Sequence, residues 1–127
     1  MSIQLNHTII AAHDNNISAN FLAEILGLPA PTTFGPFMVV QTDNGVSLDF
    51  RTTTEDFQTR HYAFLVSEEE FDEIFERISK KEITYWADHM RKQPNEINHN
   101  DGGRGVYFDD PNGHFLEVIT RPYGSGG

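Results

Sequence analysis

The residues best suited to chemistry belong to a sequence pattern that occurs twice. The heptapeptide NGVSLDF is followed later in the chain by the similar NGHFLEV. Each copy places one carboxylate, Asp49 or Glu117, shortly after an Asn-Gly turn signal. Upstream of each copy, a segment predicted to be a strand carries one histidine, His7 or His61. The sequence therefore indicates two related halves that could bring two histidines and two carboxylates together.

Imidazoles and carboxylates are ligands that several divalent metals accept together. His7, His61 and Glu117 would supply two nitrogens and one oxygen, which leaves coordination positions open for substrate or water. The chain contains no cysteine, so metal chemistry here depends on His and carboxylate ligands. We predict a divalent metal site for these residues, and nickel, zinc, iron, manganese and cobalt all suit the ligand set.

The alternation of side chains along the predicted strands supports this site. Glu117 shares a strand face with Phe115 and Ile119, and His7 shares one with Leu5. A carboxylate turned toward apolar neighbours is costly unless a cation or another partner accompanies it. A single strand histidine is more often a packing residue, but matched positions in a repeat favour ligation.

Asp49 has several possible roles. Its side chain is one methylene shorter than that of Glu117, so it could be a fourth metal ligand or fall short of the ion. It could instead hold a ligand histidine in the correct tautomer, or act as a base on a metal-bound substrate. The structural alternative is an ion pair with nearby Arg51.

Three further residues are candidates for substrate binding. Arg121 and Tyr107 neighbour the segments that carry the predicted ligands, and Trp86 offers a pocket wall with a polar group. A guanidinium could hold a carboxylate or phosphonate of the substrate. Aromatic residues at these spacings are also common in cores, and a lone arginine is also common on a surface.

The predicted elements follow the same order in both halves. A helix starting at Ser18 follows the first strand, and a capping pair, Ser67 with Glu70, starts the helix of the second half. Residues 31–36 are predicted to form a loop, and residues 88–104 a long loop that is either a lid or a surface excursion. The predicted strands are residues 3–12, 37–42, 46–50, 61–66, 83–87, 105–109 and 115–120.

Composition narrows the classes of partner. The 127 residues carry a formal net charge of −10, which opposes binding to nucleic acid or to anionic membranes. The apolar stretches are far shorter than the roughly 20 residues of a membrane span, and the N-terminus shows no signal-peptide pattern. We therefore expect a cytoplasmic protein whose partners are small molecules.

Three segments make the chain resemble the vicinal oxygen chelate superfamily, which contains glyoxalase I, extradiol dioxygenases, fosfomycin-resistance thiol transferases and bleomycin-resistance proteins. They are residues 5–7 (LNH), residues 60–64 (RHYAF) and residues 106–117 (VYFDDPNGHFLE). The resemblance covers nearly the whole chain, and the last segment is similar to the terminal ligand motif of the superfamily.

The resemblance implies an α+β fold of two tandem βαβββ modules, whose mixed sheets form a cup around a divalent metal, usually in a homodimer. Residues 1–127 would form one such domain, with module one at about residues 1–52, module two at about 60–122 and a flexible tail at 123–127. The ligand positions of the superfamily fall on His7, His61 and Glu117. Glyoxalase-like members have a fourth ligand, normally Glu, where this chain has Asp49.

The expected activity is that of a glyoxalase-like lyase or isomerase. Two adjacent substrate oxygens would bind the metal while Asp49 or Glu117 moves a proton as the base. The alternatives are an extradiol-type dioxygenase, a fosfomycin-type thiol transferase and a metal-free drug-binding protein of the bleomycin-resistance kind. The retained ligand triad favours an enzyme over the drug-binding protein.

Overall fold

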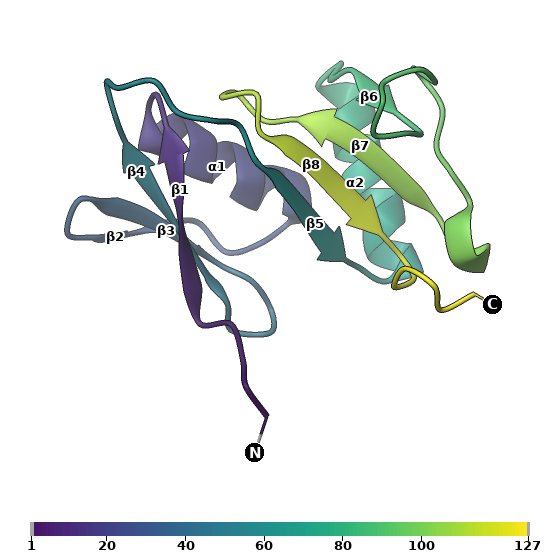
Figure 1. Ribbon diagram of the computed structural model, residues 1–127, viewed down its shortest axis with the longest axis horizontal. Helices are drawn as coiled ribbons and strands as arrows, with labels where there is room; N and C mark the ends of the chain where they lie inside the picture. The colour runs from purple at the N-terminus through teal and green to yellow at the C-terminus, as the bar shows by residue number, and fades with distance from the viewer. Residues whose placement is uncertain (1, 127) are drawn as a thin grey trace. The chain divides into compact units, whose positions relative to one another are not determined.

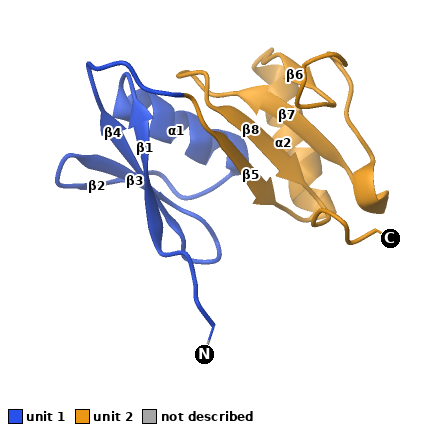
Figure 2. Cartoon of the chain, viewed as in Figure 1, with its two compact units in different colours: residues 1–58 blue, residues 59–127 orange. Residues whose placement is uncertain are grey.

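The computed structural model describes residues 2–126, which separate into two compact units (Figures 1 and 2). Unit 1 is Met1–Gln58 and unit 2 is Thr59–Gly127. Each unit contains a four-stranded mixed sheet and one long helix in the order βαβββ. The predicted α+β fold of two related modules is confirmed.

Unit 1 has its sheet in the order β1-β4-β3-β2, with β1 parallel to β4 and the remaining pairs antiparallel. The predicted loop at residues 31–36 contains a short strand, because residues 32–34 pair with the strand that follows. The elements of unit 1 are β1 (His7–Ala12), α1 (Asn15–Leu26), β2 (Thr32–Phe34), β3 (Phe37–Gln41) and β4 (Ser47–Thr52).

Unit 2 repeats this topology. Its sheet has the order β5-β8-β7-β6, again with the first pair parallel and the others antiparallel. Strand β6 is shorter than the predicted strand at residues 83–87. The elements are β5 (His61–Leu65), α2 (Glu68–Lys80), β6 (Tyr85–Trp86), the short 3-10 turn η1 (Asn100–Gly102), β7 (Gly105–Asp109) and β8 (Phe115–Ile119).

Local capping interactions define where both long helices begin. The Ser67 hydroxyl accepts a hydrogen bond from the Glu70 N–H at 3.1 Å, and the Glu70 carboxylate accepts one from the Ser67 N–H at 2.8 Å. Helix α1 begins at Asn15, because the Asp14 carboxylate accepts hydrogen bonds from the first turn. The prediction that this helix begins at Ser18 is therefore wrong by about one turn.

One face of each sheet is buried against the core of its own unit, and the alternate residues along the strands face the other way. In unit 1, Ile10, Val40, Leu48 and Phe50 are buried, and α1 contacts the sheet. The core of unit 2 is formed by residues of α2 and of the two central strands, namely Phe71, Ile74, Ile78, Val106, Phe108, Leu116 and Val118. The opposite sheet faces carry the predicted site residues.

None of the helices within residues 2–126 has the length and hydrophobicity that crossing a membrane requires.

The capping box of α2 generates a stability prediction. Replacing Ser67 by Ala removes the acceptor for the Glu70 N–H and should lower the free energy of unfolding by about 1 kcal/mol, as measured by urea denaturation. Ser79→Ala, which changes the same residue type inside α2 rather than at its cap, is the matched control. A Ser67→Ala variant as stable as this control would show that the cap does not support the helix.

Candidate functional site

The two sheets place the predicted residues in the same register. Asp49 of β4 lies beside Ile9 of β1, and Glu117 of β8 lies beside Ala63 of β5. In each case the histidine stands two residues earlier on the edge strand. His7 and Asp49 therefore share one face of their sheet, and His61 and Glu117 share one face of theirs. The repeat seen in the sequence is thus a repeat of strand register.

In unit 2 this register brings His61 and Glu117 into contact. Nε2 of His61 lies 3.1 Å from Oε1 of Glu117. The Glu117 side chain is completely buried, whereas the His61 side chain is 47% exposed. The pair therefore combines a buried oxygen donor with an accessible nitrogen donor.

Hydrogen bonding fixes the tautomer of His61. Its Nδ1 lies 2.9 Å from the carbonyl oxygen of Phe115, and because a carbonyl can only accept, Nδ1 carries a proton. Nε2 then faces the Glu117 carboxylate, and two acceptor atoms at this distance require a proton or a cation between them. Metal-binding histidines commonly donate their other N–H to a backbone carbonyl, so the donor set fits a divalent metal.

A buried histidine holds the strands of this pair together. His114 is 1% exposed, and its Nδ1 accepts a hydrogen bond from the Arg60 N–H at 2.9 Å. The Phe115 N–H donates in turn to the Arg60 carbonyl at 2.8 Å. His114 therefore fixes the start of β5, which is His61, against the start of β8.

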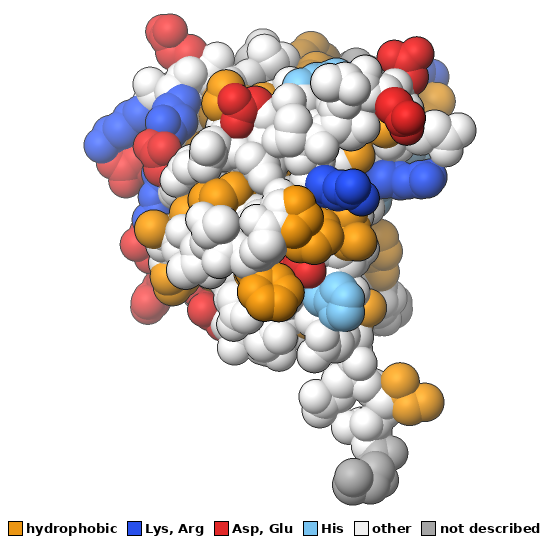
Figure 3. Space-filling model, turned by 90° about the vertical axis from the view of Figure 1, so that its left-hand side faces the viewer, with side chains coloured by type: hydrophobic (Ala, Val, Ile, Leu, Met, Phe, Trp, Pro, Cys, Tyr) orange, Lys and Arg blue, Asp and Glu red, His pale blue; other side chains and the backbone are white. Residues whose placement is uncertain are grey.

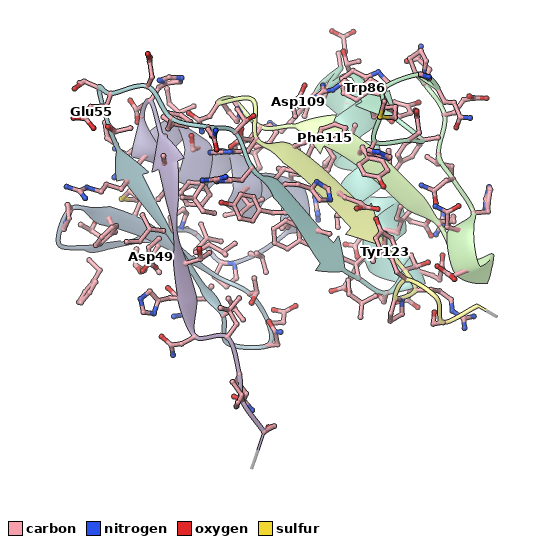
Figure 4. All side chains as sticks on the ribbon, viewed as in Figure 1. Asp49, Glu55, Trp86, Asp109, Phe115 and Tyr123 are labelled. Atoms are coloured by element: carbon pink, nitrogen blue, oxygen red, sulfur yellow. The ribbon has the colours of Figure 1, made fainter. Side chains whose placement is uncertain are left out.

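Tyr123 approaches Glu117 from the C-terminal end of the chain. Its hydroxyl oxygen lies 2.7 Å from Oε1 and 2.6 Å from Oε2 of the carboxylate, and 3.2 Å from the hydroxyl oxygen of Tyr107 (Figure 4). Sequence reasoning missed Tyr123, which lies in the stretch predicted as a flexible tail. Tyr107, one of the predicted substrate-binding residues, lies beside Glu117 on β7.

The environment of these phenols changes their acidity. Desolvation of its hydroxyl, which lies against the buried Glu117 carboxylate, raises the pKa of Tyr123 above that of a free phenol, and the hydrogen bonds to Glu117 and Tyr107 raise it further. Burial also raises the pKa of Tyr107. Both phenols are therefore neutral at physiological pH, and the Tyr123 hydroxyl donates a hydrogen bond to the carboxylate.

Trp86 forms an aromatic cluster with Phe115 on the same sheet face (Figure 4). Arg91 covers this cluster. The Arg91 guanidinium lies 4.7 Å from the centre of the Trp86 ring and 4.1 Å from that of Phe115. It also binds both carboxylate oxygens of Asp109, at 2.7 and 2.9 Å. The predicted pocket wall Trp86 is thus occupied on one side by an arginine of the same unit.

Hydrogen bonds anchor the long loop at residues 88–104. The Asp88 carboxylate accepts from the N–H groups of Lys92, at 3.0 Å, and Gln93, at 2.9 Å. Asn98 exchanges backbone hydrogen bonds with Gly105, at 2.9 and 3.0 Å. These hydrogen bonds hold the loop in a defined conformation within unit 2, beside the aromatic cluster.

Unit 1 presents its donors differently. Nδ1 of His7 lies 2.7 Å from the side-chain oxygen of Asn6, and Asp49 accepts a hydrogen bond from the Ser47 hydroxyl at 2.6 Å. Asp49 is 9% exposed, and its neighbour Ile9 is exposed. The space-filling view shows exposed hydrophobic side chains around a carboxylate and a histidine on the face that it draws (Figure 3).

The predicted ligand set divides between the units. Unit 2 joins His61 to Glu117, and unit 1 places His7 and Asp49 on one sheet face. Among residues 2–126, no group of three or more His, Cys, Asp or Glu side chains is arranged to hold a metal ion. The addition of His7 or Asp49 to the unit 2 pair stays a prediction.

Arg121 lies at the end of unit 2. Its guanidinium donates to the carbonyl of Ser125 at 3.3 Å, so it contacts the C-terminal residues. Substrate binding by Arg121 stays a prediction.

Comparison with known proteins gives the family. The chain is 30% identical to the glutathione transferase FosA of Serratia marcescens in an alignment 121 residues long that covers 90% of this chain and 78% of that protein. The solved structure of oxidase ChaP-H2 is 61% identical with a TM-score of 0.97, and both chains are covered completely. Oxidase ChaP-H1 is 59% identical with a TM-score of 0.95, covering 97% of this chain and 99% of that one. No protein-family model matches the chain.

The chain belongs to the vicinal oxygen chelate superfamily. The fold is also shared with a lactoylglutathione lyase of Agrobacterium tumefaciens, whose solved structure is 17% identical with a TM-score of 0.67 over 91% of this chain and 92% of that one.

The contact between Tyr123 and Glu117 generates a pH prediction. The folded-state pKa of Tyr123 is raised, so the stability it contributes is fully present below about pH 10 and is lost as the pH rises through the folded-state pKa. Glu117→Gln removes the adjacent negative charge and should lower this pKa. Ultraviolet difference absorbance during alkaline titration measures it, with Tyr123→Phe identifying the signal.

Asp49→Asn is the matched control, since it removes the equivalent carboxylate from unit 1. It should leave the Tyr123 titration unchanged. An unaltered titration in Glu117→Gln would mean that the hydrogen bond between Tyr123 and the carboxylate does not form.

Proposed function

We propose that this protein is a metal-dependent oxidase that binds a small oxygenated substrate through two adjacent oxygens and uses dioxygen as the oxidant. The observation that carries this proposal is the identity of 61% and 59%, over almost all of each chain, to two proteins named as oxidases. That similarity is far closer than the 30% identity to a glutathione transferase. It favours oxidation over the lyase or isomerase chemistry expected from the sequence.

The proposed ligands are His61 and Glu117 of unit 2 with His7 of unit 1, supplied by the same chain or by a second copy. Two histidines and one carboxylate with open positions are the ligand set of non-haem iron oxygenases, so iron is the proposed metal. When bound, iron would polarise the substrate oxygens and exchange electrons with dioxygen. The fit rests on the contact between Nε2 and Oε1 and on the fixed His61 tautomer.

The protein's own residues would perform the remaining steps. Asp49 or Glu117 would accept a proton from a substrate hydroxyl as the substrate binds. The Tyr107 hydroxyl, which lies near that of Tyr123, would donate a hydrogen bond to the substrate, and Trp86 would form an apolar wall. Arg121 would attract an anionic group of the substrate.

A thiol transferase is the second candidate. The relation to FosA favours it, because the similarity extends over 90% of this chain. Addition of a thiol to fosfomycin would support this reading. Metal-free drug binding stays an alternative, and a homodimer and a cytoplasmic location stay predictions.

The test combines metal analysis with oxygen uptake. Protein loaded anaerobically with ferrous iron should hold about one ion per site, and this iron should be lost in His61→Ala, Glu117→Ala and His7→Ala, as measured by elemental analysis. His89→Ala, a histidine of the 88–104 loop, is the control and should retain iron. Catechols then serve as the first substrates in an oxygen electrode.

The iron-loaded protein should consume dioxygen with at least one oxygenated substrate. Conversion of a 2-oxoaldehyde thiol adduct without oxygen uptake would contradict the oxidase proposal and support a lyase activity instead. Consumption of fosfomycin only when a thiol is present would contradict the same proposal and support a thiol transferase.

A further inference from the structure

The C-terminal residues form a built turn rather than a free end. We use the name C-terminal turn for residues 122–126. The Ser125 N–H donates to the Pro122 carbonyl at 3.1 Å, and Arg121 donates to the Ser125 carbonyl at 3.3 Å. The Gly126 N–H donates to the Asp101 carboxylate at 3.2 Å, which attaches the turn to η1.

Gly126 fits this attachment because it has no side chain. A Cβ at this position would overlap the backbone of Asp101, so any larger residue must displace the turn or η1. The position of the C-terminal turn is therefore set by close packing as well as by hydrogen bonds.

The turn delivers one hydroxyl to a buried carboxylate. The Tyr123 residue is 63% exposed, yet its hydroxyl lies 2.6 Å from Oε2 and 2.7 Å from Oε1 of Glu117, which is itself fully buried. The ring thus contributes little to the core. What the residue provides is a hydrogen-bond donor at the point where Glu117 needs one.

Both carboxylate oxygens contact the Tyr123 hydroxyl, and Oε1 also contacts His61. Oε1 lies 3.1 Å from Nε2 of His61, whereas the shorter of the Tyr123 contacts is to Oε2. A cation bound between Nε2 and Oε1 would leave Oε2 to the Tyr123 hydroxyl. A buried oxygen without that donor would lose its hydrogen bond, and the carboxylate would be freer to rotate away from His61.

We propose that Tyr123 is a positioning residue for the metal ligand Glu117, held in place by the C-terminal turn. Its hydroxyl contacts both oxygens and holds the carboxylate in the orientation in which Oε1 faces His61, where the metal would bind. This inference rests on the proposed metal site. It assigns to the end of the chain a role in metal affinity.

The experiment measures cobalt(II) affinity by competition with a chromogenic chelator, together with the visible absorption of the bound ion. Tyr123→Phe should weaken binding by about 10- to 100-fold, the usual effect of removing a hydrogen-bond partner from a metal ligand, and should shift the cobalt spectrum. Tyr85→Phe is the control. Tyr85 pairs with Phe108 on the opposite face of the sheet, so affinity should stay within about twofold.

A second pair of variants tests the turn without changing the phenol. Gly126→Ala displaces the turn and should weaken cobalt binding in the same direction as Tyr123→Phe. Ser125→Ala is its matched control, because the contacts of Ser125 in the turn are made by its backbone. Circular dichroism of the metal-free variants checks that each remains folded.

Equal or tighter cobalt binding by Tyr123→Phe would overturn the proposal, and tighter binding would show that the hydroxyl competes with the metal. Wild-type protein that takes up no cobalt would overturn it as well. Failure of the oxidase proposal looks different, since wild type would then bind metal with the expected difference between variants but consume no dioxygen.

Discussion

The structure of the site depends on one costly group, the fully buried carboxylate of Glu117 in the central strand β8. An ionised carboxylate loses its hydration on burial, so the surrounding protein has to provide hydrogen bonds or positive charge. His61 approaches one oxygen from the neighbouring strand, and Tyr123 approaches both from the C-terminal turn. Both contacts help to offset the cost of burying the carboxylate. A cation beside Glu117 would offset the same cost.

The two halves show how one topology gives different environments. The strand register around Asp49 matches that around Glu117, but the shorter Asp49 side chain accepts its hydrogen bond from Ser47 of its own strand. Unit 2 has a phenol at its carboxylate and an aromatic cluster covered by Arg91 beside it. The two matched carboxylates therefore lie in different surroundings.

Specific contacts also anchor the polar segments around the sheet of unit 2. Arg91 lies over two aromatic rings while binding Asp109, and its guanidinium pKa is raised mainly by that hydrogen bond. Asp88 holds the start of the 88–104 loop, and Gly126 holds the C-terminal turn against η1. Segments rich in Gly, Asn and Ser are ordered here because their backbone groups find specific partners.

The sequence by itself determined that each half has a strand, a helix and then further strands, which strands carry His61 and Glu117, and the capping box of α2. These features depend on local patterns of two to seven residues, such as strand alternation and the spacing of Ser67 and Glu70. Elsewhere the local sequence pattern did not identify the first residue of a helix or the presence of a strand. The Asp14 cap was hidden among asparagines that also suit loops, and β2 forms only because β3 pairs with it.

The tertiary structure alone decided the role of Tyr123 and the cover that Arg91 provides for Trp86. Composition favoured a flexible tail, since Pro, Gly and Ser dominate it, and no periodic pattern connects Tyr123 to Glu117. The contact exists because the chain turns back after β8 and Gly126 packs against Asp101. Side chains brought together by a turn and a close backbone approach leave no regular spacing in the sequence, so only the folded chain specifies which donor meets the buried carboxylate.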